Sequence, residues 1–287
     1  MKIGTVTIDG RPVTVVSRDG RLVRLDHAPV GTAFVSAWVA SDTSLHDQVA
    51  QALTYELPPE VWVDPETAIF LPPIPDARLV IAIGLNYASH CREQGKEPPA
   101  TPVFFAKLPS CLTGHRQSVV HWPVTSRLDF EGELAVVIGR GGRAIPEHEA
   151  LSALFGYSVF NDVTARDLQR SDGQWVRGKS LDTFGPMGPL ITLARDVPDP
   201  QALRLQTRVN GELRQDASTA EMAFGVARIV AHVSQAITLR PGDVITTGTP
   251  AGVGVFASPP RFLEKDDRME VTIEGLGTLS NTVAGPD

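Results

Sequence analysis

Short apolar runs bounded by turn residues recur along this chain, and they restrict it to a fold rich in β-structure. Strands are predicted over residues 79–84, 133–139, 205–209, 212–214, 243–247 and 268–273. Asn210-Gly211 has the composition of a primed two-residue hairpin turn. One amphipathic helix is predicted over residues 222–237, where apolar residues recur at helical spacing. Because strands and helices do not alternate regularly, we expect a mixed α/β, β-rich domain.

The first 75 residues have a different pattern from the rest. Apolar and polar residues alternate up to about residue 25, with Asp-Gly turns between them, which predicts a small β-meander. Residues from about 30 to 55 are weakly helical, and prolines become dense around 71–75. We therefore predict a small N-terminal, β-containing accessory domain over residues 1–75 and a catalytic domain over residues 76–287.

Composition and charge argue against several classes of function. The net charge of −7 argues against a basic face for nucleic acid and against a polybasic patch for a membrane surface. No segment is long and apolar enough to span a bilayer, and the first residues enter a strand pattern without the layout of a signal peptide. Two cysteines, Cys91 and Cys111, do not make a disulfide framework. We expect a cytoplasmic enzyme.

An acidic cluster opens one of the predicted strands. Glu131 and Glu133 are two residues apart, so on a strand their side chains point the same way, with Cα atoms roughly 6–7 Å apart. Adjacent carboxylates repel each other, and a divalent cation removes that repulsion. Oxygen ligands suit Mg²⁺, Mn²⁺ or Ca²⁺, and we expect a third ligand from the polar run 161–167. The alternatives are an exposed acidic strand and a carboxylate pair for glycoside hydrolysis.

A histidine and two lysines are further candidates. His90 and Glu93 are three residues apart, so on a helix the carboxylate would orient the imidazole as in general base catalysis. An exposed helix with an incidental ion pair is the alternative. Lys107 and Lys179 lie in apolar surroundings and are expected to stabilise an anion or donate a proton, unless they extend to the surface. Cys91 is expected to be a small buried side chain rather than a nucleophile.

A glycine-rich loop over residues 247–254 follows the predicted strand at 243–247. Such a loop exposes backbone N–H groups and, at Thr249, a hydroxyl to an anion. It lacks the sequence of a P-loop and of a dinucleotide-binding turn. We interpret it as a cradle for a carboxylate, and an ordinary tight turn is the alternative.

Taken together, these elements resemble the fumarylacetoacetate hydrolase family from about residue 78 to the end. The matching segments are 84–87 with His90, 129–133, 161–167, 178–180 with 182–184, 247–254 and 273–277. Two departures concern loop shape: His115 follows Gly114 where relatives have proline, and residues 265–267 lack a glycine. The resemblance implies the family's β-rich mixed α/β fold, usually in a homodimer, and an N-terminal accessory domain that also occurs in relatives.

The resemblance also implies roles for individual residues. The metal ligands are Glu131, Glu133 and Asp162, the water-activating pair is His90 and Glu93 with Lys179 stabilising charge, and the substrate contacts are Tyr87, Lys107, Arg166, Gln169 and Thr249. Mg²⁺ is the expected cofactor, with Mn²⁺ or Ca²⁺ as alternatives.

The function expected from this resemblance is metal-dependent hydrolysis of a C–C bond in a small β-diketo acid, such as an acylpyruvate, through a metal-bound enolate. The alternatives within the family are decarboxylation of an oxaloacetate-like acid and isomerisation or dehydration of a keto acid. A metal-binding protein without enzymatic activity is a more remote alternative. The partners expected are a small keto acid and a second copy of the chain.

Overall fold

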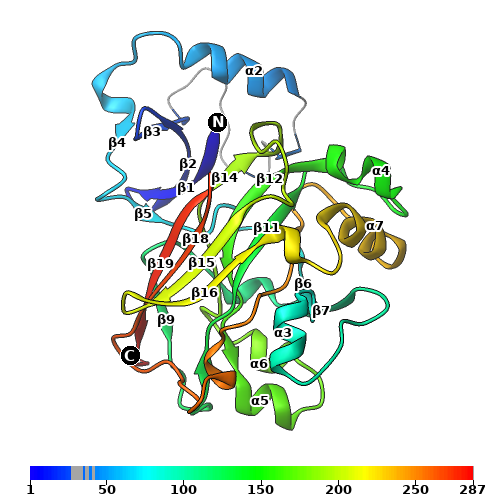
Figure 1. Cartoon of the computed structure of the whole chain (residues 1–287). Helices are drawn as coiled ribbons and strands as arrows, with labels where there is room; N and C mark the ends of the chain where they lie inside the picture. The colour runs from blue at the N-terminus through cyan, green and yellow to red at the C-terminus, as the bar shows by residue number, and fades with distance from the viewer. Residues whose placement is uncertain (27–34, 36–38, 41–42, 287) are drawn as a thin grey trace.

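The structure is a computed structural model and describes residues 1–26, 35, 39–40 and 43–286 (Figure 1). Its strands are β1 Lys2–Ile8, β2 Arg11–Arg18, β3 Arg21–Arg24, β4 Trp62–Val63, β5 Ile69–Phe70, β6 Val80–Gly84, β7 Val103–Lys107, β8 Leu112–Thr113, β9 Ser118–Val120, β10 Leu128–Asp129, β11 Gly132–Ile138, β12 Leu154–Asn161, β13 Thr164–Ala165, β14 Gly185–Leu193, β15 Arg204–Val209, β16 Glu212–Ser218, β17 Val244–Thr246, β18 Arg268–Ile273 and β19 Gly277–Ala284. Its helices are α2 Thr43–Ala52, α3 Ala88–Glu93, α4 Glu147–Ala150, α5 Arg166–Ser171, α6 Val176–Lys179 and α7 Val226–Ala236. The predicted mixed, β-rich α/β fold is confirmed.

One large sheet runs through the molecule in the order β4-β3-β2-β1-β14-β12-β11-β17-β6-β7. Its centre is β11, which pairs antiparallel with both β12 and β17. Alternate side chains of β11 enter two separate hydrophobic clusters, as the two-residue period of a strand requires. Leu134 and Val136 pack in the cluster that includes α7, whereas Ala135 and Val137 pack in the cluster that includes β1 and β2. Because side chains on both faces of β11 are packed, the strand holds the residues at its start in a fixed position.

A smaller sheet, in the order β16-β15-β18-β19-β9, packs over one face of the large sheet (Figure 1). The β15–β16 hairpin turns at Asn210 and Gly211, whose φ angles are 52° and 82°. Both values are positive, as a primed turn requires, which confirms the hairpin prediction. The predicted strands at 79–84, 133–139, 243–247 and 268–273 are also present as β6, β11, β17 and β18.

The N-terminal meander is present as β1, β2 and β3, and it joins the large sheet because β1 pairs antiparallel with β14. Part of the helix predicted over residues 30–55 lies outside the described residues, and α2 occupies its last part. The parts before and after residue 75 share the large sheet and a hydrophobic cluster. Their division into two domains therefore stays a prediction. None of the described helices is long and apolar enough to cross a membrane.

The helix predicted over residues 222–237 is shorter than expected, because α7 begins at Val226. The preceding residues are held in another conformation by the Asn86 side chain and backbone. The N–H of Phe224 donates to Asn86 Oδ1 at 2.9 Å, and the N–H of Ala223 donates to the Asn86 carbonyl at 2.7 Å. Met222 forms an isolated antiparallel bridge with Tyr87. These tertiary contacts override the helical periodicity.

The missing glycine at 265–267 has a structural explanation. Asp266 has a φ of 73°, the left-handed conformation that glycine adopts most easily. Aspartate tolerates this conformation better than most residues, so the tight turn forms without glycine.

His115, the second departure, predicts how stability depends on pH. Burial and the neighbouring Arg116 lower the pKa of His115 to about 4, and its Nδ1 accepts the N–H of Ser280 at 3.0 Å. The folded state therefore favours the neutral ring. This contribution is complete above the unfolded pKa of roughly 6.5 and is lost as the pH falls toward 4. Urea titrations at pH 7 and pH 4.5 measure how far the free energy of unfolding falls between the two. We expect this fall to be smaller by about 1–2 kcal/mol in His115→Asn, which keeps a hydrogen-bond acceptor. An identical decline in both proteins would contradict the assignment.

Candidate metal centre and active site

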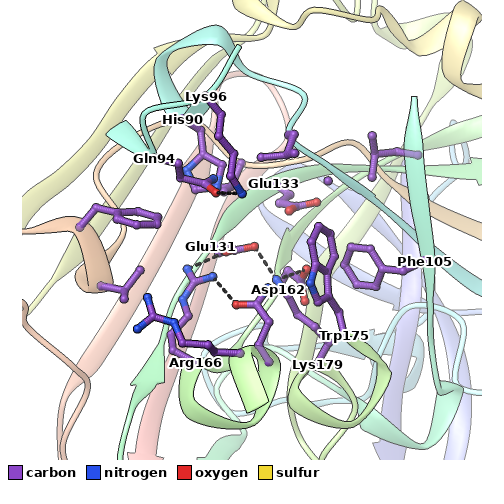
Figure 2. Close-up of a pocket in the computed structure, with 18 of the residues that line it drawn as sticks. His90, Gln94, Lys96, Phe105, Glu131, Glu133, Asp162, Arg166, Trp175 and Lys179 are labelled. Carbon is purple, nitrogen blue, oxygen red and sulfur yellow. Dashed lines mark hydrogen bonds and ion pairs between the residues drawn. The ribbon is translucent and has the colours of Figure 1, made fainter. Parts of the chain in front are cut away.

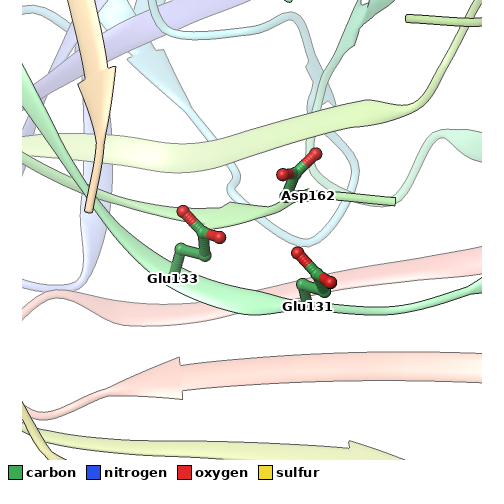
Figure 3. Close-up of side chains that lie close together, drawn as sticks. All are labelled: Glu131, Glu133 and Asp162. Carbon is green, nitrogen blue, oxygen red and sulfur yellow. The ribbon is translucent and has the colours of Figure 1, made fainter. Parts of the chain in front are cut away.

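Three buried carboxylates converge where β11 begins and β12 ends. One oxygen each from Glu131, Glu133 and Asp162 lie within 4.8 Å of one another (Figure 3). The β11–β12 pairing sets this arrangement, because Gly132 lies opposite Asn161 and the N–H of Asp162 donates to the Glu131 carbonyl at 2.8 Å. The predicted convergence of two acids from one strand with a third from the polar run is therefore present in the structure.

Three cationic side chains surround these carboxylates, and Figure 2 shows two of them, Arg166 and Lys179. The Lys179 ammonium donates to Glu131 Oε2 at 2.6 Å and to Asp162 Oδ2 at 2.7 Å. Lys107 donates to Asp162 Oδ1 at 2.6 Å and to the Lys179 carbonyl. Arg166 lies 2.6 Å from Glu131 Oε1. All three cations are buried, which rules out the alternative in which the two lysines extend to the surface.

The cations act unequally on the carboxylates. Burial alone would raise the pKa of Glu131, but Arg166 and Lys179 outweigh it and hold the pKa at about 2. Burial raises the pKa of Glu133 well above its ordinary value, and the nearby charges of Asp162 and Glu131 raise it further. Glu133 is thus the carboxylate whose negative charge the protein's own cations leave largely unbalanced.

The donor set fits a hard divalent cation. Three carboxylates supply the oxygen ligands that Mg²⁺ and Mn²⁺ prefer, and no cysteine or histidine belongs to this cluster of described residues. Four of the oxygens already accept hydrogen bonds or ion pairs from lysine or arginine, but each carboxylate oxygen offers more than one lone pair. The unbalanced charge of Glu133 is the feature that a cation would satisfy.

His90 and Glu93 form the predicted pair on α3. The Nδ1 of His90 lies 2.6 Å from Glu93 Oε1, and Glu93 Oε2 accepts the N–H of Gly252 at 3.1 Å. Glu93 thus holds the imidazole through Nδ1 and leaves Nε2 for other chemistry. Phe256 packs against the ring with centroids 6.0 Å apart. The neighbouring Cys91 is buried, which raises its thiol pKa and agrees with a packing role.

The glycine-rich loop cradles carboxylates, but they are the protein's own. The N–H of Gly248 donates to Glu133 Oε2 at 2.9 Å, and the N–H groups of Gly254 and Val255 donate to Asp129 at 2.7 and 3.0 Å. Gly248 has a φ of 90°, and a Cβ there would lie 2.8 Å from the Asn86 Cβ. The interpretation of these groups as a cradle for an external anion is therefore corrected.

A cavity of about 230 Å³ lies over the carboxylates. The predicted site residues that line it are His90, Glu131, Glu133, Asp162, Arg166, Gln169, Lys179 and Thr249. Three others do not line it: Tyr87 is fully buried beside Met222, Lys107 contacts Asp162, and Glu93 contacts His90. The predicted substrate contacts at Tyr87 and Lys107 are therefore not supported by their positions.

Several residues of the site were not identified from the sequence. Lys96, Arg127, Arg170, Phe105 and Trp175 also line the cavity. Gln215, from the smaller sheet, accepts the N–H of Gly132 at 3.0 Å and donates to Thr249 Oγ1 at 2.7 Å. Thr249 in turn donates to the Gly132 carbonyl at 3.0 Å, so its hydroxyl proton is already engaged. No sequence signal distinguishes these residues, because they come from separate segments that only the fold brings together.

Residues 79–284 match the family model described as fumarylacetoacetate (FAA) hydrolase C-terminal. The chain belongs to the fumarylacetoacetate hydrolase family. It is 46% identical over 215 residues to oxaloacetate tautomerase YisK of Bacillus subtilis (strain 168). The matched stretch covers 74% of this chain and 71% of the relative.

Two solved structures of this family share the fold over the full length of both chains. Fumarylacetoacetate hydrolase from the psychrophile Exiguobacterium antarcticum is 38% identical, with a TM-score of 0.84. Maleylpyruvate hydrolase from Sphingobium sp. SYK-6, in complex with manganese (II) ion and pyruvate, is 26% identical, with a TM-score of 0.83. The family membership inferred from the sequence motifs is confirmed, and the relatives are named as enzymes of small keto acids.

Proposed function

We propose that this chain is a divalent-metal-dependent tautomerase that interconverts the enol and keto forms of an oxaloacetate-like acid. The observation that carries the proposal is the buried trio Glu131, Glu133 and Asp162 at a cavity that His90 also lines. The 46% identity to an oxaloacetate tautomerase favours the isomerase alternative over the hydrolase expected first.

Glu131, Glu133 and Asp162 would hold the cation. When bound, Mg²⁺ or Mn²⁺ would supply a Lewis acid for the oxygens of an α-keto acid. The remaining chemistry belongs to the chain. Conversion of the enol to the ketone removes a proton from the enol hydroxyl and adds a proton at the adjacent carbon. His90, oriented through Nδ1 by Glu93, has Nε2 available to accept and deliver a proton. Lys179 lies beside Glu131, Glu133 and Asp162, which form the floor of the cavity. Its positive charge would offset negative charge that develops on the substrate oxygen.

The direct test follows the enol of oxaloacetate by its ultraviolet absorbance. We expect the protein with Mg²⁺ to accelerate loss of the enol over the buffer and metal background, and chelation to remove the acceleration. Proton NMR of the same mixture identifies the product, which separates tautomerisation from decarboxylation to pyruvate. Enol loss no faster than the metal-only control, with Mg²⁺ shown to be bound, would contradict the proposal.

The His90 imidazole gives a prediction of its own. His90→Gln is expected to slow enol-to-ketone conversion by about 10²–10⁴-fold, since it removes the proton carrier. Mn²⁺ affinity is expected to stay unchanged, because His90 is not among the three clustered carboxylates. Steady-state rates and a Mn²⁺ titration of the same preparation measure both effects. Full activity in this variant would remove His90 from the mechanism.

Hydrolysis of an acylpyruvate remains a second candidate, favoured by the 2.6 Å contact between His90 and Glu93 that suits water activation. Proton NMR with acetylpyruvate tests it, since hydrolysis gives acetate and pyruvate. Retained hydrolysis in His90→Gln would exclude the water-activating role. The homodimer and the cytoplasmic location stay predictions.

A further inference from the structure

The cavity has a charge pattern opposite to that of the whole chain. The chain has a net charge of −7, yet five lysine and arginine side chains line the cavity against three acidic ones. The acidic ones are the metal-ligand candidates, and the lysines and arginines are Lys96, Arg127, Arg166, Arg170 and Lys179. A cavity with charge of one sign and low-dielectric walls concentrates ligands of the opposite sign. The excess of positive charge therefore favours an anionic ligand.

The five lysines and arginines form two groups. Arg166 and Lys179 are buried and form ion pairs with the floor carboxylates. Lys96, Arg127 and Arg170 are exposed at the edge of the cavity, and we name these three the cationic rim. Among the described residues, no carboxylate lies within ion-pair distance of any cationic-rim side chain. The cationic rim therefore has charge available that the floor does not.

Arg127 and Arg170 reach the edge of the cavity from two adjacent segments. Arg170 is four residues after Arg166 on α5, so both lie on the helix face that carries Gln169 into the cavity. The carbonyl of Arg127 accepts the N–H of Arg166 at 3.0 Å, which fixes Arg127 beside the start of α5.

Two of the cationic rim's side chains have uncharged neighbours instead of acidic ones. The Arg127 guanidinium lies 5.8 Å from the ring centroid of Phe262, a contact that leaves its N–H donors free of a carboxylate. Lys96 extends from beyond α3 and contacts Gln94 Oε1 at 3.4 Å, next to His90 (Figure 2). The cationic rim can thus face an anion that is anchored at the floor.

We propose that Lys96, Arg127 and Arg170 recognise the second carboxylate of a dicarboxylic keto acid and so determine substrate class. This inference rests on the proposed function for the first end of the substrate, the α-keto acid that the floor would hold. A monocarboxylic keto acid satisfies the floor but leaves the cationic rim without a partner. A four-carbon dicarboxylic acid supplies the second carboxylate without exceeding a cavity of about 230 Å³.

The test uses two unreactive ligands that differ only at the distal end. Malate and lactate share a 2-hydroxy acid, and malate alone adds a second carboxylate. Calorimetry with the Mn²⁺-loaded protein measures both affinities in wild type, Arg127→Gln, Arg170→Gln and the double variant. Arg140→Gln, which removes an exposed arginine outside this cavity, is the matched control. Arg170→Lys tests whether charge alone is sufficient.

We expect wild type and Arg140→Gln to bind malate at least about tenfold more tightly than lactate, as a charge-assisted hydrogen bond provides. The double variant is expected to lose most of that preference while its lactate affinity stays unchanged, and high salt is expected to reduce the wild-type preference. Equal affinities in wild type, or an unchanged preference in the double variant, would overturn the proposal. A preference for malate without tautomerase activity would support the cationic rim and contradict the proposed function instead.

Discussion

Lys179→Met is expected to lower the free energy of unfolding of the metal-free protein by about 3–5 kcal/mol. Lys179 is 2% exposed and donates to both Glu131 and Asp162, so its removal leaves two buried carboxylates without their shared partner. Methionine fills a similar volume, which keeps the loss of packing small. Urea unfolding with and without Mg²⁺ measures the effect. Mg²⁺ is expected to narrow the difference, because a bound divalent cation would replace the missing charge.

The control for this experiment is Lys265→Met, at an exposed lysine that forms no ion pair with any residue in the described part of the chain. It is expected to change the free energy of unfolding by no more than about 0.5 kcal/mol. A Lys179→Met protein as stable as this control would show that Lys179 does not balance the carboxylates.

Glu133→Gln, unlike Lys179→Met, is expected to raise the free energy of unfolding of the metal-free protein while it weakens metal binding. The raised pKa of Glu133 means that the folded protein disfavours its ionised form. The contribution of protonated Glu133 to stability is fully present below the ordinary pKa of 4.5. It is lost as the pH rises, until Glu133 ionises in the folded state as well. Glutamine has no charge and can still accept the N–H of Gly248. We expect the metal-free variant to gain about 1–3 kcal/mol at neutral pH, and Mn²⁺ affinity to fall at least about 100-fold.

Glu264→Gln, at an exposed carboxylate, is the matched control and is expected to change neither quantity. A pH series distinguishes the cause, since the stability gain of Glu133→Gln is expected to vanish at acidic pH, where Glu133 is protonated. A variant destabilised at every pH would mean that Glu133 contributes through contacts that glutamine cannot replace.

Much of this site follows from local sequence pattern. The apolar run after Glu133 predicts a buried strand, and a buried strand that opens with two acids two residues apart predicts a shared face for them. Likewise, the three-residue spacing of His90 and Glu93 predicts their contact on a short helix. Each of these features depends on the spacing of residues within one helix or strand, and that spacing is visible in the sequence.

The remaining features depend on contacts between distant segments, which periodicity does not encode. Asn86 shortens α7 through hydrogen bonds to residues 223 and 224, and Gln215 reaches Thr249 from the other sheet. The glycine-rich loop has the composition of an anion-binding turn, but the fold directs its N–H groups to internal carboxylates. The basic residues of the cationic rim are ordinary exposed residues in the sequence and become a group only around the cavity.

Glu131, Glu133 and Asp162 together would hold the divalent cation that the proposed keto-acid chemistry requires. The most direct test of this site is a titration with Mn²⁺ at neutral pH, in which electron paramagnetic resonance counts the free ion. We predict one tight site per chain in wild type and in His90→Gln, and loss of that site in Glu133→Gln and in Asp162→Asn. Equal Mn²⁺ binding by wild type and both carboxylate variants would show that these carboxylates do not form the metal site.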